Sequence, residues 1–277
     1  MLPDTKPCPR RERSVSDAGA VLDDLVGESA ELDLLVAELG RDEWAVATPA
    51  PRWTVAHQIA HLAWTDRAAH LAVTAPDSFG AEVEKALAAP ATFVDEGAEE
   101  GAALDPAVLL ARWRDGRERL QEALRAAPSG ARFPWYGPPM STASMATGRL
   151  METWAHGQDV ADALGVRRRP TARLRHVARI GVRARDFAFG ARGLDVPGEE
   201  FRVELTAPGG ELWEYGPADA VQRVTGPALD FCLLVTQRAH RDDLALCATG
   251  ADADRWVGIA QAFAGPPGAG RPAKGSA

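Results

Sequence analysis

The sequence has few cysteines, no long apolar run and no excess of positive charge. Its three cysteines, Cys8, Cys232 and Cys247, are far apart and odd in number. They predict neither a disulfide framework nor a CxxC zinc site, and they favour a reducing, cytoplasmic location. No stretch approaches the roughly 18 uninterrupted apolar residues of a membrane span, and no apolar segment follows the polar residues 1–15. We therefore expect neither a membrane helix nor a signal peptide.

The net charge of the chain is −8 at pH 7. Binding to nucleic acid or to an anionic membrane requires a basic surface, and the basic runs at 9–13 and 167–170 are too short to supply one. The chain also lacks the GxGxxG and GxxxxGK[ST] loops of nucleotide binding and the GxSxG turn of serine hydrolases. We expect a small molecule as the partner, with no nucleic acid and no membrane, and a monomer or homodimer.

Four helices are predicted in the first part of the chain. The whole chain is 277 residues long, 46% hydrophobic and 25% charged, which is typical of a globular protein. Apolar residues recur at helical spacing over four segments, at about 16–39, 54–73, 106–127 and 144–164. Two of the connections between them are long, which favours a four-helix bundle with crossovers. The connection from Pro76 to about residue 104 is predicted to be irregular, with a short helix at 80–88.

After Pro170 the pattern changes to that of a mixed helix and strand domain. A helix is predicted at 172–190, followed by strands at 201–207 and 211–215, a buried helix at 226–238, a strand at 244–250 and a final helix at 252–265. The predicted fold class is α+β. The predicted division of the chain is a disordered N-terminus at 1–15, a bundle at 16–168, a smaller α+β domain at 169–266 and a disordered tail at 267–277.

Glu152 and His156 lie one turn apart on the predicted helix 144–164, opposite an apolar face that includes Leu150 and Trp154. This spacing alone favours a solvated helix face over a metal site. His57 and His61 are likewise four residues apart, on helix 54–73. Helical bundles build metal sites from Glu and His side chains on facing helices, so one of these histidines with Glu152 and His156 forms a candidate ligand set. The other histidines are expected at the surface: His70, His176 and His240.

Two segments resemble a known family. "WTVAHQIAHL" (53–62) and "LMETWAHGQDV" (150–160) are similar to the signatures of the DinB-like bundles that include mycothiol-dependent maleylpyruvate isomerase. The resemblance implies that His61, Glu152 and His156 hold a divalent metal, and that His57 lies behind the ligands or faces substrate. The segments "VTGPALDFCLLVTQR" and "IAQAFAGPPGAGR" resemble an actinobacterial subgroup of metal-binding proteins. They imply a C-terminal α+β domain similar to sterol-carrier proteins.

The resemblance also implies a chemistry. The metal is expected to be zinc, with nickel, iron or manganese as alternatives, and mycothiol is a candidate thiol cofactor. The expected reaction is isomerisation or thiol transfer on a small molecule, with the metal as Lewis acid. Two alternatives stay open: a thiol-independent hydrolase, lyase or cyclase acting on a specialised metabolite, and a non-catalytic protein that binds metal or ligand.

Further candidate site residues lie near the predicted metal helix. His57 and Asp159 are candidate catalytic residues. The loop "FPWYGPPMS" (133–141) carries Trp135, Tyr136 and Met140, which could form an apolar wall against substrate or pack into the core. Arg149 is a candidate for binding a substrate carboxylate, although arginines at helix ends usually form surface ion pairs.

Overall fold

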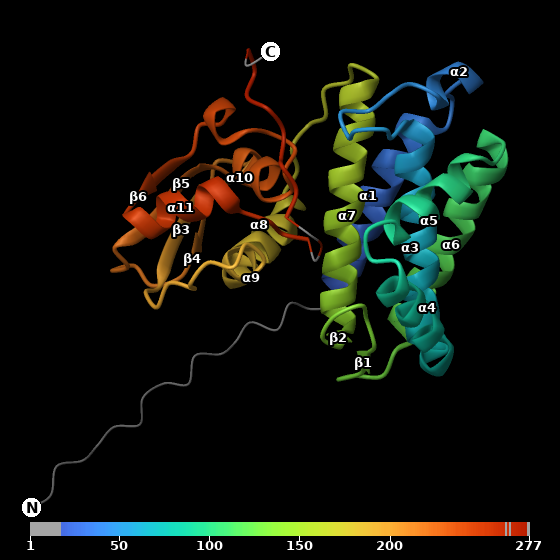
Figure 1. Ribbon diagram of the computed structural model, residues 1–277, viewed down its shortest axis with the longest axis horizontal. Helices are drawn as coiled ribbons and strands as arrows, with labels where there is room; N and C mark the ends of the chain where they lie inside the picture. Colours follow the sequence, from blue (N-terminus) through green and yellow to red (C-terminus); the bar gives the residue numbers. More distant parts are fainter. Residues whose placement is uncertain (1–17, 264, 266, 276–277) are drawn as a thin grey trace, which may run out of the picture.

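The computed structural model describes residues 18–263, 265 and 267–275, which form two lobes side by side (Figure 1). One lobe is a helical bundle, and the other is smaller and contains a sheet. The predicted disordered segment 1–15 and Cys8 lie outside the described residues. Within the described part of the chain, no helix is both long enough and apolar enough to cross a membrane.

The bundle contains the four helices predicted from the sequence. They are α1 (Ala18–Val36), α3 (Val55–Thr74), α6 (Pro106–Ala126) and α7 (Thr142–Ala163). Helix α3 packs against both α6 and α7, and α1 packs against α7. The start of α6 follows the usual rules, because the Asp105 carboxylate accepts a hydrogen bond from the Ala107 amide and Pro106 occupies the first helical position. Helix α7 is followed at Gly165 by a left-handed residue, with φ of 66°.

The stretch predicted to be mostly irregular is helical. It forms α4 (Pro76–Ala88) and α5 (Phe93–Ala102), while a further short helix, α2 (Arg41–Trp44), lies outside this stretch and precedes α3. Helix α5 lies close against α3 because it carries glycine at the contact. A Cβ atom on Gly101 would lie 2.7 Å from Cβ of Ala60, and one on Gly97 would lie 2.8 Å from the Trp64 ring. Strands β1 (Arg132–Phe133) and β2 (Met140–Ser141) pair antiparallel just before α7.

The smaller lobe holds a mixed sheet of four strands in the order β4-β3-β5-β6, with β3 and β5 parallel and the outer pairs antiparallel. The fold is therefore α+β, as predicted. The elements of this lobe are α8 (Leu174–Arg183), α9 (Arg185–Gly190), β3 (Phe201–Thr206), β4 (Leu212–Tyr215), β5 (Gln222–Pro227), α10 (Ala228–Val235), η1 (Arg241–Asp243), β6 (Cys247–Thr249) and α11 (Ala251–Ile259).

Two details of this lobe differ from the prediction. The single helix predicted at 172–190 is divided near Ala184 into α8 and α9. The helix predicted from residue 226 begins at Ala228 as α10, directly after β5, which the sequence pattern did not reveal. Strand β5 is defined by its partners, since it pairs with β3 on one side and β6 on the other.

Helix α7 is shared by the cores of both lobes. Leu150, Met151 and Trp154 belong to the apolar cluster that also contains Phe231 and Trp256 of the smaller lobe. Val160, farther along α7, belongs to a cluster of the bundle. One helix therefore contributes apolar side chains to two cores, and its remaining face is free to carry polar groups toward α3.

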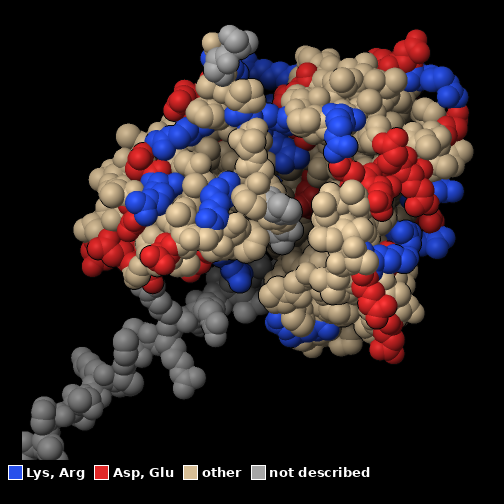
Figure 2. Space-filling model, viewed as in Figure 1, with Lys and Arg blue, Asp and Glu red and all other residues tan. Residues whose placement is uncertain are grey.

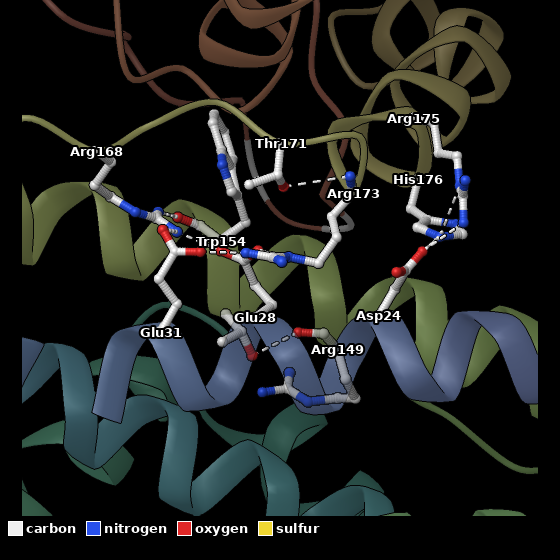
Figure 3. A network of polar contacts seen from close by, with 11 residues as sticks. Asp24, Glu28, Glu31, Arg149, Trp154, Arg168, Thr171, Arg173, Arg175 and His176 are labelled. Carbon is white, nitrogen blue, oxygen red and sulfur yellow. Dashed lines mark hydrogen bonds and ion pairs between the residues drawn. The ribbon is translucent and has the colours of Figure 1, made fainter. Parts of the chain in front are cut away.

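The lobes are joined by a network of ion pairs, which we call the interlobe clasp. It consists of Glu28, Glu31, Arg168 and Arg173 (Figure 3). Arg173 Nε lies 2.6 Å from the Glu28 carboxylate, and Arg168 contacts the other oxygen of that carboxylate. Arg173 also pairs with Glu31. Glu28 is only 1% exposed, whereas Glu31 is partly exposed, so the Glu28 carboxylate is the buried centre of this network.

The described part of the predicted disordered tail, residues 267–275, lies against both lobes. Arg271 contacts the carboxylate of Asp159 on α7 and the carbonyl oxygen of Pro49. The Lys274 amide donates to the Asp243 carboxylate at 3.0 Å. The abundance of Pro and Gly in this tail predicted disorder because it gives no apolar pattern, whereas its contacts are polar.

Candidate metal centre

Three side chains converge between α3 and α7. His61 Nε2 on α3 lies 3.3 Å from Glu152 Oε2, and His156 Nε2 lies 3.1 Å from the same oxygen. Glu152 and His156 are neighbours on α7, one turn apart. One donor atom from each of the three residues lies within 4.8 Å of the others. The structure thus brings together His61, Glu152 and His156, the three residues predicted as metal ligands.

The charges of this group suit a cation. Burial would raise the pKa of Glu152, but the His156 and His61 imidazoles beside its carboxylate outweigh that effect and hold the pKa well below its usual range. Burial, together with the neighbouring His61, lowers the pKa of His156 to about 4. At neutral pH an ionised carboxylate therefore faces a neutral imidazole. Two imidazole nitrogens and one carboxylate oxygen form a donor set that fits a divalent metal such as zinc.

A chain of hydrogen bonds leads away from His156. Its Nδ1 lies 2.5 Å from Oε1 of Gln58, which is fully buried. Nε2 of Gln58 donates to Thr48 Oγ1 at 2.9 Å, and that hydroxyl donates to the Trp53 carbonyl at 2.8 Å. Gln58 is not among the site residues predicted from the sequence. The available signal was its position three residues before His61, which places both side chains on one side of α3.

Trp53 covers the two histidines of the group. Its ring centroid lies 5.4 Å from that of His61 and 5.9 Å from that of His156. The indole nitrogen donates to the Asp95 carboxylate on α5 at 3.0 Å. Because α5 lies close to α3 through Gly97 and Gly101, it is in position to hold this indole. Trp53 belongs to the motif at 53–62 but is not among the site residues predicted from the sequence.

His57 does not join the three donors. Its Nδ1 accepts a hydrogen bond from the Thr54 amide at 3.3 Å, where it completes the capping box of α3. With Nδ1 as acceptor, Nε2 carries the proton and faces the Glu99 carboxylate of α5 at 2.9 Å. The position of His57 thus depends on a helix start and a neighbouring helix, and its catalytic role stays a prediction.

Asp159 forms ion pairs with two arginines that lie outside the bundle. It is fully buried on α7, three residues after His156. Arg238 Nη2 lies 2.8 Å from one carboxylate oxygen, and Arg271 contacts the other. Two guanidinium groups therefore meet one carboxylate where the smaller lobe approaches the metal helix. The surface is hollowed between the two lobes on the face shown in Figure 2.

The candidate substrate residues are spread along the bundle. Arg149 is buried and pairs with Asp66, with Nε 2.8 Å from the carboxylate. Trp135 stacks on Phe79 at 5.7 Å between ring centroids. Tyr136 packs edge-on against Phe93 at 5.6 Å, and burial raises its pKa to about 12. Met140 lies in β2 near the start of α7, against the apolar cluster that contains Phe133 and Met145. Their roles toward substrate stay predictions.

Comparison with known proteins identifies the family. The model of the mycothiol maleylpyruvate isomerase N-terminal domain matches residues 25–161, a range that contains all three donors. Two uncharacterized proteins from strains of Mycobacterium tuberculosis are each 58% identical over 257 residues, which cover 93% of this chain and all of the relative. The chain belongs to the mycothiol maleylpyruvate isomerase N-terminal domain family.

Crystal structures of a mycothiol-dependent maleylpyruvate isomerase and of a mutant of that enzyme share the fold. The TM-scores are 0.55 and 0.56, at 16% identity, over 91% of this chain and 96% of the other. The family domain occupies the bundle, and a second model, described as wyosine base formation, matches residues 197–249 of the smaller lobe. The arrangement of the family bundle followed by a small lobe with a mixed sheet is therefore shared over most of both chains.

Proposed function

We propose that the protein is a divalent-metal-dependent enzyme that acts on a small molecule, by isomerisation or by transfer of a thiol. The observation that carries this proposal is the meeting of His61, Glu152 and His156 at one point between α3 and α7. Three protein donors leave coordination positions for other groups, as in catalytic rather than structural metal sites. The donor set fits zinc first, with nickel, iron or manganese as alternatives.

The chemistry that such a metal supplies when bound is that of a Lewis acid, which polarises a carbonyl group or favours the thiolate form of a thiol. The chain supplies the surroundings. Trp53 shields the imidazoles with a flat apolar ring. The ionised Glu152 carboxylate balances part of the charge of a cation. His57 and Asp159 are proposed catalytic residues, and Trp135, Tyr136, Met140 and Arg149 are proposed to contact substrate.

The thiol part of the proposal draws on the mycothiol-dependent isomerase that shares this fold. Of the cysteines in the described residues, Cys232 is buried, and burial raises the pKa of its thiol. Cys247 is exposed on β6. Neither belongs to the three-donor group, so the reacting thiol is proposed to come from a separate molecule such as mycothiol. A sterol-carrier-like architecture for the smaller lobe is also part of this proposal.

The first test is metal content. His61→Ala, Glu152→Ala and His156→Ala should each lose stoichiometric metal, because each removes one of three donors. His57→Ala and His70→Ala should retain it and serve as matched controls. Elemental analysis of the purified variants gives the answer. Loss of metal in His57→Ala but not in His61→Ala would show that the wrong histidine of α3 has been assigned.

The second test separates a catalytic metal from a structural one. Chelation should leave the helical circular dichroism signal largely intact, because the bundle core is built from apolar side chains such as Leu32, Leu109 and Trp113. Collapse of that signal would make the metal structural. Activity is then assayed on α-keto acid and unsaturated acid substrates, with and without mycothiol. Turnover that survives complete metal removal would contradict the proposal.

A further inference from the structure

The geometry points to Gln58 as the positioning residue of this centre. The Thr48 hydroxyl fixes the orientation of the Gln58 side-chain amide. The amide oxygen of Gln58 then holds the His156 imidazole with the proton on Nδ1 and the lone pair on Nε2. Nε2 is the nitrogen that faces Glu152. The inference rests on the metal site proposed above, and it explains how the His156 ligand is oriented in the metal-free protein.

The direction of each hydrogen bond between Trp53, Thr48, Gln58 and His156 follows from the backbone carbonyl group at the start of the chain of bonds. The carbonyl oxygen of Trp53 can only accept. The Thr48 hydroxyl, 2.8 Å away, therefore donates its single hydrogen to it. The oxygen of that hydroxyl is then left as an acceptor, so the Gln58 group that lies 2.9 Å from it must be the NH₂ end of the amide.

The other end of the amide then determines the state of His156. With its NH₂ group toward Thr48, Gln58 turns Oε1 toward His156 Nδ1 at 2.5 Å. An amide oxygen cannot donate, so Nδ1 carries the hydrogen, and in the neutral ring Nε2 has the lone pair. This lone pair faces the Glu152 carboxylate at 3.1 Å. Two acceptors at this distance repel each other unless a cation lies between them.

The two imidazoles of the centre are thus held differently. His156 is fixed by a hydrogen bond to a fully buried amide. His61 Nδ1 is buried and has no hydrogen-bond partner in the part of the chain that the structure describes. The His61 ring instead contacts Trp53 and Trp64, at 5.4 and 5.9 Å between centroids. Partners behind a ligating histidine set its tautomer and its strength as a donor, so Gln58 should control the affinity of the site.

The test uses the full chain and two readouts. Imidazole ¹⁵N chemical shifts of the metal-free protein report the tautomer of His156, and competition with a chromophoric chelator gives the dissociation constant for Zn²⁺. The parent protein should show the Nδ1–H tautomer. Gln58→Met, which keeps the length of the side chain without an acceptor, should lose this preference and bind Zn²⁺ about 10- to 100-fold more weakly.

Two further variants separate positioning from packing. Gln58→Glu keeps an acceptor toward Nδ1 and should retain both the tautomer and tight Zn²⁺ binding. Gln222→Met removes another buried amide, in the smaller lobe, and should change stability without changing Zn²⁺ affinity. If Gln58→Met does not fold, Thr48→Val replaces it, since it removes the hydroxyl that orients the amide.

The outcomes for Gln58 and for the metal site are distinguishable. An Nε2–H tautomer of His156 in the parent protein would overturn the inference, as would unchanged Zn²⁺ affinity in Gln58→Met. If the parent binds no Zn²⁺ while His156 shows the Nδ1–H tautomer and Gln58→Met loses it, the proposed metal function fails and the role of Gln58 stands.

Discussion

His176 is a buried imidazole on α8 and does not belong to the three-donor group. Its Nε2 lies 2.7 Å from the Asp24 carboxylate on α1, beside Arg175, which pairs with the same carboxylate (Figure 3). Burial lowers the pKa of His176, and the hydrogen bond with Asp24 only partly opposes that shift. The prediction of a surface position for His176 is wrong, since the residue is only 6% exposed.

This shift predicts a pH dependence of stability. The unfolded chain binds a proton at His176 near pH 6.5, whereas the folded chain binds it only at lower pH. The free energy of unfolding should therefore fall as the pH drops below about 6.5, by less than about 1.4 kcal/mol per pH unit for this group. Urea unfolding at pH 7.5 and 5.5, in the parent and in His176→Gln, checks it. The variant should lose less stability between the two pH values, and an equal loss in both would contradict the assignment.

At the scale of elements, the approach of α5 to α3 depends on glycine. Gly101→Ala would place a methyl group 2.7 Å from Cβ of Ala60 and should destabilise the protein by roughly 1–3 kcal/mol through overpacking. Gly80→Ala in α4 is the matched control, because a Cβ atom there has open space. It should stabilise by up to about 1 kcal/mol through helix propensity. Denaturant unfolding measures both, and changes of the same sign would show that the contact is not tight.

The glycines of α5 also explain why this helix could not be predicted from the sequence. The four long helices were predictable because their apolar residues recur at helical spacing. Helix α5 was not, since Gly97 and Gly101 lower helix propensity and are required for a contact with α3 that only the tertiary structure reveals. Strand β5 is six residues long and gains its identity from pairing with β3 and β6, which no local pattern contains.

The centre itself was partly predictable for a related reason. Glu152 and His156 stand one turn apart on one helix, so local spacing made them a pair, and the family resemblance chose His61 over His57. Gln58 had no such signal, because its meaning comes from a contact with a histidine 98 residues farther along the chain. Partners that lie behind a ligand are defined by the packing of helices, not by a motif.

At the scale of the whole molecule, the interlobe clasp should contribute more to the free energy of unfolding than the same number of surface ion pairs. Glu28→Ala removes the buried carboxylate that faces Arg168 and Arg173, and leaves both guanidinium groups with only the partly exposed Glu31 as a partner. We expect a loss of about 3 kcal/mol in the free energy of unfolding, measured with urea. Asp115→Ala breaks the exposed pair with Arg119 and should cost less than about 1 kcal/mol. Equal losses in both variants would show that the clasp is no stronger than a surface pair.

Because α7 contributes to the cores of both lobes, it couples movement of the smaller lobe to the three-donor group. Its Leu150 and Trp154 are packed in the core of the smaller lobe, while Glu152 and His156 face α3. A rotation of the smaller lobe that preserves its core must therefore carry α7 along, whereas His61 stays with α3. The separation of 3.3 Å between His61 and Glu152 would be among the first distances to change. Any force that turns one lobe against the other, including a molecule wedged between them, would act directly on the spacing of the three donors.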